Sequence, residues 1–342
     1  MKIIHICELI NNHANGISGI VPKYVERQSK YIAVELYNLN GDEPVPFPGD
    51  YDLVIVHGVY SIKTLKFFYK YIHKKYKYVF VPHGGLTQMS QLKSKKKKAI
   101  ANKFLFRQFY RKAEAIQFLC QNELNNSIEV GNCNKIVCNS GVECLPERKY
   151  KAHQREGFRF VYIGRVTIFY KGLDILLHAI ARNKTYMEEH NVTVSIIGTN
   201  NYNEPLDELY ELIEINKLER IVTVDLTGRF GEEKTRELLD ADCFLQTSRS
   251  EGMPLGVLEA LSLGMPVLLT KPVGFTDLID RYQNGYYCEA EVDAIAEMMI
   301  KMVESKDKMD EFSIGSYQAS KEYDWEKVTE DTIAKYREIC AK

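Results

Sequence analysis

The stretch SRSEGMPLGVLEALSLGMPV, Ser248–Val267, carries the signature of a helix that is buried on nearly every side. Pro254 suits the first turn of a helix, and Gly264, followed shortly by a proline, suits its end. Apolar side chains between these two marks surround the axis of a helical wheel. Two carboxylates depart from this pattern, since Glu251 stands before the helix and Glu259 lies within it. Because an unpaired buried carboxylate is costly, the stretch predicts hydrogen-bond donors for Glu259.

Around this stretch, short apolar runs alternate with helical patterns along the whole chain, which predicts βαβ units and parallel sheets. A length of 342 residues favours two domains. The charged segment 143–157 contains a proline, lacks periodicity and is typical of a linker. We therefore expect an α/β fold with two doubly wound domains. The expected strands are Lys2–Cys7, Leu53–His57, Tyr78–Pro82, Ala115–Phe118, Lys135–Cys138, Phe158–Ile163, Val192–Ile197, Ile221–Leu226, Cys243–Thr247 and Pro266–Thr270, and the expected helices of the second half are about 172–183, 205–217, 231–240 and 254–263.

The bulk composition narrows the class of protein. Hydrophobic residues make up 45% of the chain, charged residues make up 27%, and the net charge of -1 argues against a nucleic-acid partner. The eight cysteines are scattered without metal-ligand spacing, which is typical of reduced thiols in the cytosol. The N-terminus turns polar too early for a signal peptide, and no apolar run approaches the roughly 20 residues of a membrane span. We expect a cytoplasmic protein, and if it meets a membrane we expect the contact to be with the inner face.

The second half contains two loops that would form one ligand site. Ligands of doubly wound sheets bind beyond the carboxyl ends of the strands where the strand order reverses, and the common order 3-2-1-4-5 places that crevice between the first and fourth strands. GRVTIFYKG, Gly164–Gly172, and SRSEGMP, Ser248–Pro254, follow those two strands. Arg165 and Lys171 precede a helix start, and two cations beside helix amides suit a diphosphate. The alternative is a solvated loop with two surface cations.

The two glutamates would bind the rest of this ligand. The hydroxyls of a ribose would supply two donors to Glu259, whereas the alternative is an internal salt bridge or cap. Glu251 could accept hydrogen bonds from a sugar ring or support a reacting group, and the alternative is a carboxylate that the helix dipole favours. A cationic loop and an acidic loop over one crevice would thus hold a pyrophosphate and its pentose together.

Three segments of the second half resemble the nucleotide-sugar domain of glycosyltransferase family 4, a retaining family of the GT-B fold. They are GRVTIFYKGLDILLHAI, LTGRF and SRSEGMPLGVLEALSLGMPVLLT, and the resemblance is strong over about 157–285. Glu251 and Glu259, with seven residues between them, match the paired-glutamate motif of that family. In the first half the resemblance is looser, with NGISGIV similar to the glycine-rich loop, VPHGGL to the histidine loop, CNSGVE to the hinge entry and YDWEKV to the start of the last helix.

The resemblance implies two Rossmann-like doubly wound domains that face a central cleft. Residues 1–150 would bind the acceptor, residues 151–322 would bind the nucleotide sugar, and residues 323–342 would form a helix that crosses back to the first domain.

The resemblance also implies roles for single residues. Arg165 and Lys171 would hold the donor diphosphate and stabilise the leaving charge. Glu259 would bind the ribose, and Glu251 would touch the transferred sugar. His83 would lie at the sugar as a hydrogen-bond donor or orienter, and the alternative is a structural histidine after a strand. The other donor-binding positions are small residues near the phosphates, backbone amides at a helix start and a stretch near the base: Gly16, Ser18, Gly19, Gly252, Met253, Pro254, Leu255, Gly228 and Arg229.

The expected function is a retaining, hexosyl-type glycosyltransferase that acts in cell-surface polysaccharide or glycolipid synthesis. It would move a sugar from a nucleoside-diphosphate sugar, with UDP favoured by family frequency, to a glycan or lipid-linked acceptor. The alternatives are a GT-B epimerase or phosphorylase and a non-catalytic sugar-nucleotide sensor. A nicotinamide-dependent oxidoreductase is disfavoured, because no G-x-G-x-x-G follows a strand with an acidic residue about 20 positions further on.

No metal cofactor is expected. The chain contains one literal Asp-x-Asp match, Asp240-Ala-Asp242, but this motif lies between a helix end and a strand start, at the amino end of the sheet. Arg165, Lys171 and helix dipoles would stabilise the departing diphosphate without a metal ion. We therefore expect chelators to leave the activity intact.

A basic run, QLKSKKKKAIANKFLFRQFYRK at residues 91–112, has nine Lys or Arg residues and no acidic residue. Aromatic and leucine side chains interleave with the charges, which predicts a basic amphipathic helix. Such a helix suits an anionic membrane surface or an anionic acceptor such as a lipid diphosphate. The alternative is an exposed lysine-rich helix.

Overall fold

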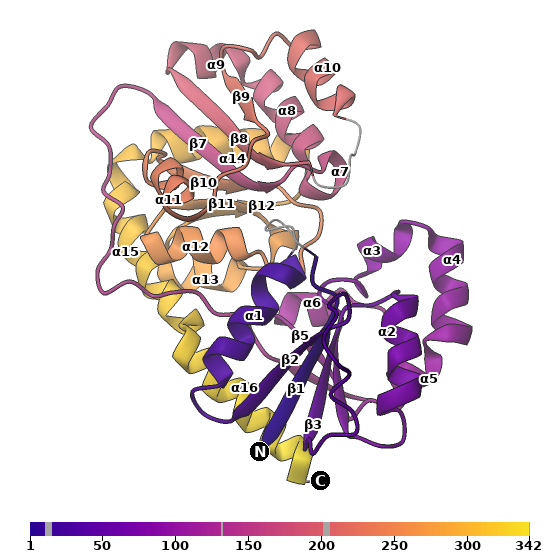
Figure 1. The fold of residues 1–342 in the computed structure, drawn as a ribbon. Coiled ribbons are helices and arrows are strands. Elements are labelled where there is room, and N and C mark those ends of the chain that lie inside the picture. Colours follow the sequence, from indigo (N-terminus) through magenta and orange to yellow (C-terminus); the bar gives the residue numbers. More distant parts are fainter. Residues whose placement is uncertain (11–15, 131–132, 201–205, 342) are drawn as a thin grey trace. The chain divides into compact units, whose positions relative to one another are not determined.

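The computed structural model describes residues 1–10, 16–130, 133–200 and 206–341. Backbone contacts divide the chain into two compact units. Unit 1 comprises Met1–Gly141 together with Trp325–Lys342, and unit 2 comprises Val142–Asp324. Figure 1 shows that the C-terminal helix α16 (Trp325–Ala341) runs beside helix α1 (Gly16–Gln28) in unit 1.

Unit 1 is built on a six-stranded parallel sheet with the order β2-β1-β3-β4-β5-β6 (Figure 1). Helices α1 and α16 pack against each other, and Tyr336 of α16 donates a hydrogen bond of 2.6 Å to buried Gln117 in the sheet. An aromatic cluster that includes Phe68, Phe109 and Tyr110 packs with the apolar side chains of the other face. The strands are β1 (Lys2–Cys7), β2 (Ala33–Asn38), β3 (Leu53–His57), β4 (Tyr78–Val81), β5 (Ala115–Phe118) and β6 (Asn134–Val137), and the other helices are α2 (Ile62–Phe67), η1 (Phe68–Ile72), α3 (Gln88–Leu92), α4 (Lys95–Ile100), η2 (Ala101–Leu105), α5 (Arg107–Arg111) and α6 (Gln121–Asn125).

Unit 2 repeats this architecture with the sheet order β12-β11-β10-β7-β8-β9. Numbered along unit 2 the order is 3-2-1-4-5-6, so the expected reversal between the first and fourth strands is confirmed. Helices α8 and α14 pack together, as do α12 and α15. The strands are β7 (Phe158–Arg165), β8 (Val192–Thr199), β9 (Val222–Asp225), β10 (Cys243–Gln246), β11 (Val267–Thr270) and β12 (Gly285–Cys288), and the helices are α7 (Ile168–Lys171), α8 (Leu173–Arg182), α9 (Lys184–Glu189), α10 (Asp207–Ile215), α11 (Gly231–Leu239), α12 (Leu255–Leu263), η3 (Lys271–Val273), α13 (Thr276–Tyr282), α14 (Val292–Glu304), η4 (Lys306–Lys308), α15 (Met309–Ser320) and η5 (Lys321–Tyr323).

Three sequence-based expectations about local structure were wrong or incomplete. The edge strands β2 and β12 were missed, because neither carries the long apolar run of a central strand. The segment 143–157 is not a free linker, since Tyr150 is fully buried in unit 2 and its hydroxyl donates to the Asp242 carbonyl at 3.2 Å. The basic run 91–112 is not one helix, because Ser94 adopts φ 61° and separates α3 from α4, and the stretch continues through η2 into α5.

The start of α8 requires a glycine at position 172. Gly172 has φ +63°, a left-handed conformation that side chains disfavour. A Cβ atom added there would lie 2.1 Å from the carbonyl oxygen of Thr247. The loop after β7 can therefore approach the end of β10 only because this residue has no side chain.

We expect Gly172→Ala to destabilise unit 2 more than the matched control Gly231→Ala. Both positions have positive φ, which costs an alanine about 1–2 kcal/mol. Only Gly172 adds a steric overlap, typically worth about 1–3 kcal/mol, because no atom lies within 4 Å of a Cβ at Gly231. Denaturant unfolding followed by circular dichroism would measure both losses, and equal losses would contradict the close approach.

Candidate functional site

Two loops of unit 2 meet at the carboxyl ends of β7 and β10. The Thr247 hydroxyl lies 3.1 Å from the carbonyl oxygen of Lys171 and 3.0 Å from that of Gly172. Arg249 forms a two-pronged ion pair with Asp174 of α8, with N···O distances of 2.6 and 2.7 Å. These bonds fix the loop after β10 against the start of α8, so the convergence of the two loops is observed.

Lys171 and Glu251 form an ion pair at the point where the loops meet. The Lys171 ammonium lies 2.6 Å from Glu251 Oε1, and the side chains are only 14% and 11% exposed. Gln246 and Ser248 donate to the same oxygen at 2.6 and 2.5 Å. Within the described residues no donor reaches Glu251 Oε2, so this oxygen can accept a hydrogen bond from a ligand.

Glu259 does not have the environment that its position in the helix suggested. Its side chain is 39% exposed, and it pairs with Lys234 of α11. The alternative interpretation, an internal salt bridge, is therefore what the structure shows. Because the Glu259 carboxylate is partly exposed and already paired, it does not need ribose hydroxyls as hydrogen-bond donors. The assignment of Glu259 to donor binding therefore rests on the resemblance alone.

The other donor-site candidates of unit 2 surround the same end of the sheet. Arg165 is the exposed last residue of β7, and its carbonyl accepts a hydrogen bond of 2.6 Å from the buried Tyr162 hydroxyl. Gly228 follows β9 with φ +75°, close to the Thr199 methyl at the end of β8. The Arg229 guanidinium that follows is paired with Asp225 at 2.5 Å. Arg229 thus lies beyond the carboxyl end of β9 with its charge already balanced.

The turn before α12 supplies fewer amides than expected. Gly252, Met253 and Pro254 are placed between the acidic loop and the helix, and Pro254 is the N-cap residue. The Leu255 amide donates to the Met253 carbonyl at 3.0 Å within this turn. Of the expected amides, that of Leu255 is engaged by the protein itself.

The Asp240-Ala-Asp242 motif lies in an arginine network at the opposite end of the sheet. Asp242 is almost fully buried and accepts from the Arg159 amide at 2.7 Å and from Arg155 at 3.0 Å. Asp240 pairs with the same two arginines. Both carboxylates are therefore occupied by cations of the protein.

In unit 1, His83 lines a pocket of about 390 Å³ beyond the carboxyl ends of β1, β3 and β4. Its backbone has φ 50°, and its Nε2 atom lies 2.8 Å from Nδ1 of His57. Burial lowers the pKa of His83 to about 3. Glu8 also lines the pocket, and its Oε1 atom accepts from Ser61 and, at 2.8 Å, from Thr64. Glu8 was not predicted as a site residue, although its position directly after β1 is a signal for one.

The expected glycine-rich loop is helical where it is described. Gly16, Ser18 and Gly19 form the first turn of α1, and the Ser18 hydroxyl oxygen accepts from the Ile10 amide at 3.0 Å. Asn15, the first residue of that motif, lies outside the described residues. The three candidates therefore begin a helix instead of lining an open loop.

Glu123 was also missed, and it supports the loop that carries His83. It is fully buried and accepts from the Gly84 and Leu119 amides at 2.5 and 2.7 Å. Burial raises the pKa of this carboxyl to about 7 in spite of these hydrogen bonds. No pattern in the sequence marks Glu123, because its partners are backbone groups.

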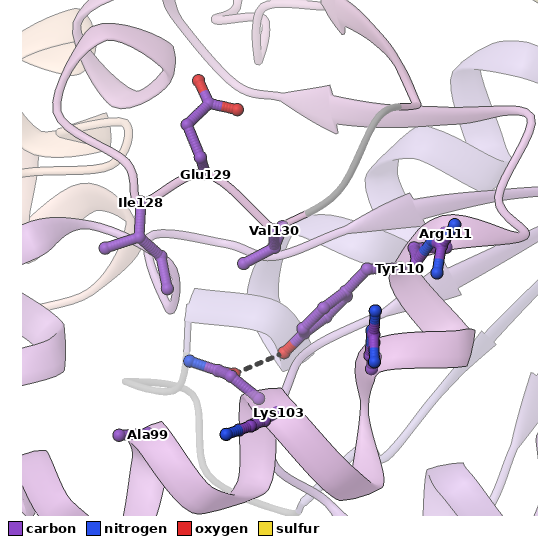
Figure 2. Close-up of a pocket in the computed structure, with 9 residues that line it drawn as sticks. Ala99, Lys103, Tyr110, Arg111, Ile128, Glu129 and Val130 are labelled. Atoms are coloured by element: carbon purple, nitrogen blue, oxygen red, sulfur yellow. Dashed lines mark hydrogen bonds between the residues drawn. The ribbon is translucent and has the colours of Figure 1, made fainter.

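The basic run lines a second pocket in unit 1, of about 680 Å³ (Figure 2). Figure 2 shows Lys103 and Arg111 on one wall and Ile128, Glu129 and Val130 on the other. Arg107 completes a row of cations four residues apart, and the Tyr110 hydroxyl donates to Asn102 at 3.0 Å between them. The pocket thus combines three cations with the apolar side chains of Ile128 and Val130 and with one carboxylate, Glu129, which pairs with Lys135 at 2.6 Å.

The class of protein follows from this fold and this site. Residues 146–319 match the family model described as glycosyl transferases group 1. The match covers about half of the chain, and the chain belongs to that family. The two-domain α/β fold is that of GT-B glycosyltransferases. Of the residues that the structure describes, none form a helix with the length and apolar character of a bilayer span.

Known proteins agree with this assignment. An uncharacterized glycosyltransferase of Methanocaldococcus jannaschii is 29% identical over 217 residues, 54% of this chain and 51% of that protein. The O-antigen biosynthesis glycosyltransferase WclY of Escherichia coli is 31% identical over 112 residues, 32% of this chain and 28% of WclY. The chain thus spans about half the length of these relatives, or less. The structure of Anabaena HepE in complex with UDP and glucose is similar with a TM-score of 0.69, 19% identity and coverage of 99% of this chain and 100% of that chain.

We expect Glu123 to make unit 1 less stable as the pH rises. Its folded-state pKa is raised, so its stabilising contribution is complete below about pH 4.5 and is lost as the pH rises through 7. Relative to Glu123→Gln, the wild type should lose about 3 kcal/mol of unfolding free energy over this range. The single tryptophan, Trp325, packs in unit 1 and reports its unfolding by fluorescence. A difference between the two proteins that does not change with pH would contradict the raised pKa.

Proposed function

We propose that the chain is a retaining, hexosyl-type glycosyltransferase that uses a nucleoside-diphosphate sugar, with UDP as the favoured nucleotide. The observation that carries this proposal is the Lys171–Glu251 pair where the loops after β7 and β10 meet. An ammonium and a carboxylate side by side suit a ligand with a diphosphate next to a sugar hydroxyl. The complex of HepE with UDP and glucose, a protein of the same fold, supports the choice of ligand.

The residues of this site divide the chemistry between them. When the sugar–phosphate bond breaks, negative charge develops on the departing diphosphate, and Lys171 with Arg165 would stabilise it. The start of α8, directly after Lys171, adds backbone amides and the positive end of a helix dipole. Glu251 Oε2 would accept from a sugar hydroxyl and orient the ring. Glu259 would bind the ribose, with Lys234 moving aside or bonding the ligand itself.

We propose that this chemistry needs no metal ion. The charge that a metal would neutralise is matched by the Arg165 and Lys171 side chains. The one Asp-x-Asp motif of the chain is held by Arg155 and Arg159 at the other end of the sheet.

In this proposal unit 1 binds the acceptor, a glycan or a lipid-linked sugar in cell-surface polysaccharide or glycolipid synthesis. The name of the WclY relative, an O-antigen biosynthesis enzyme, supports this setting. The second pocket of unit 1 adds to the support, because its three cations outnumber its one carboxylate, Glu129, and so suit an anionic headgroup or a lipid diphosphate. Exposed Ile100, Phe104 and Leu105 lie on the same segment as the cations. We propose that the surface formed by the second pocket and these exposed apolar residues lies on the anionic inner face of a membrane.

We expect one nucleoside-diphosphate sugar of a panel built on UDP, GDP and ADP to raise the melting temperature, because a ligand at 100 times its dissociation constant contributes about 2.7 kcal/mol. Lys171→Gln keeps a donor near Glu251 but removes the charge, so it should weaken binding about 10- to 100-fold. Calorimetry on both proteins would measure the change. Lys184→Gln, at a lysine that faces Glu188 on α9, is the matched control and should bind normally.

Transfer itself is tested by mixing the preferred donor with lipid-linked acceptors and measuring the free nucleoside diphosphate and the anomeric configuration of the product. A chelator should leave the rate unchanged. No heat with any member of the panel would end the proposal, and an inverted product would end its retaining part.

We expect vesicles that contain an anionic phospholipid to bind the protein in a salt-dependent manner. The double variant Arg107→Gln/Arg111→Gln should bind about 30-fold more weakly, since each cation near such a surface contributes about 1 kcal/mol. The control Lys23→Gln/Lys30→Gln removes one exposed charge of α1 and one of the turn after it, and should bind as the wild type does. Co-sedimentation would measure all three proteins, and binding that ignores both lipid charge and salt would exclude this surface.

A further inference from the structure

A line of four polar side chains runs through unit 1, in which buried Gln28, His5 and His57 lead to half-buried His83 at its pocket. Gln28 Oε1 lies 2.8 Å from His5 Nε2, and His5 Nδ1 lies 2.8 Å from His57 Nε2. His57 Nδ1 lies 2.8 Å from His83 Nε2. Gln28, His5 and His57 are each no more than 3% exposed, so water does not complete their hydrogen bonds. The line connects α1, β1 and β3 with the loop after β4.

The geometry is that of hydrogen bonds between ring edges. The ring centroids of His5 and His57 are 5.1 Å apart with planes 16° apart, and those of His57 and His83 are also 5.1 Å apart. These separations exceed the N···N distances by about one ring width, as bonds that lie near the ring planes require. Face-to-face stacking would not bring one nitrogen of each ring so close to its neighbour.

The hydrogen bonds along this line must all be donated in the same direction, either toward Gln28 or away from it. A neutral imidazole donates through one nitrogen and accepts through the other. The amide oxygen of Gln28 can only accept, so His5 must carry its proton on Nε2 and accept at Nδ1. The same rule then places the proton of His57 on Nε2, and that of His83 on Nε2. His83 Nδ1 is left without a proton.

The three rings are neutral under ordinary conditions. Burial lowers the pKa of His5 to about 4 and that of His83 to about 3, and it lowers the pKa of His57 well below its usual value. An imidazolium has no acceptor, so a charged ring would interrupt the line. Within the described residues no protein group bonds to His83 Nδ1, and His83 lines the pocket that also contains Glu8, Ser61 and Thr64.

We propose that Gln28, His5 and His57 are positioning residues that hold His83 as its Nε2–H tautomer, so that Nδ1 accepts a hydrogen bond from a sugar hydroxyl in this pocket. The occupant rests on the function proposed above, whereas the tautomer does not. Glu8 is a second acceptor in the same pocket, so the pocket suits a ligand with at least two hydroxyl groups. His83 serves here as a hydrogen-bond acceptor and not as a donor.

The direct test is the ¹⁵N NMR spectrum of the histidine side chains, recorded near pH 8 on the full chain. His5, His57 and His83 should each show a protonated Nε2 and an unprotonated Nδ1. His190 is an internal control of the opposite kind, because its Nδ1 lies 2.8 Å from the Tyr186 carbonyl and must donate. If the three rings show protonated Nδ1 atoms instead, Gln28 presents its amide nitrogen to His5 and the proposal is overturned.

Two variants of Gln28 separate positioning from packing. Gln28→Glu retains an acceptor and should keep the tautomers of all three rings. Gln28→Leu removes it and should shift the tautomer ratio of His83 about fivefold, the equilibrium factor of one ordinary buried hydrogen bond. Unchanged tautomers in Gln28→Leu, with the fold intact by circular dichroism, would overturn the positioning role.

A kinetic comparison then tests the occupant. With an active donor and acceptor pair, Gln28→Leu should lower the turnover rate or raise the KM of the ligand in this pocket, and Gln28→Glu should restore the wild-type value. Equal kinetics in both variants, together with a shifted tautomer, would refute a hydroxyl at Nδ1. If no transfer is found at all, the NMR spectrum still decides the tautomer of His83. Failure of the proposed function is therefore distinguishable from failure of the positioning role of Gln28, His5 and His57.

Discussion

The candidate donor site depends on the ion pair between Lys171 and Glu251, two residues 80 positions apart. The pair forms because β7 and β10 are neighbours in the sheet, although β8 and β9 lie between them in the sequence. A nearly buried carboxylate is stable only with donors, and three of them converge on a single oxygen. The remaining oxygen is what makes the pair a binding element and not only a structural one.

The same constraint governs unit 1, where buried polar groups gather beyond the carboxyl ends of the strands. Glu123 accepts from the Gly84 amide in the loop that carries His83 and from the Leu119 amide after β5, and His57 bonds to the ring of His83. Each of these groups is satisfied by another part of the fold, so its orientation is fixed before any ligand arrives. A prearranged set of acceptors suits hydroxyl-rich ligands, which is consistent with membership of the glycosyl transferases group 1 family.

The sequence predicted some elements of the fold correctly and missed others. Central strands such as β3 and β4 are fully buried and continuous in apolar residues, so their sequences identified them. The edge strand β2 is half-exposed and was missed, and the run 91–112 was taken as one helix because its charge pattern hides the break at Ser94. Glu259 was placed correctly in a buried helix, yet Lys234 of α11 lies beside it, and no local pattern predicts a partner from another helix.

The sequence by itself determined two doubly wound domains, the reversal point of the second sheet and the pairing of a cationic loop with an acidic one. These features are local or follow from topology, because apolar periodicity sets the strands and parallel connections limit their order. Only the tertiary structure decided which carboxylate is buried, which cation it meets and which nitrogen of His83 bonds to His57. Those outcomes depend on contacts between residues far apart in the chain, and a hydrogen bond is made or lost by shifts of less than an ångström that no sequence pattern encodes.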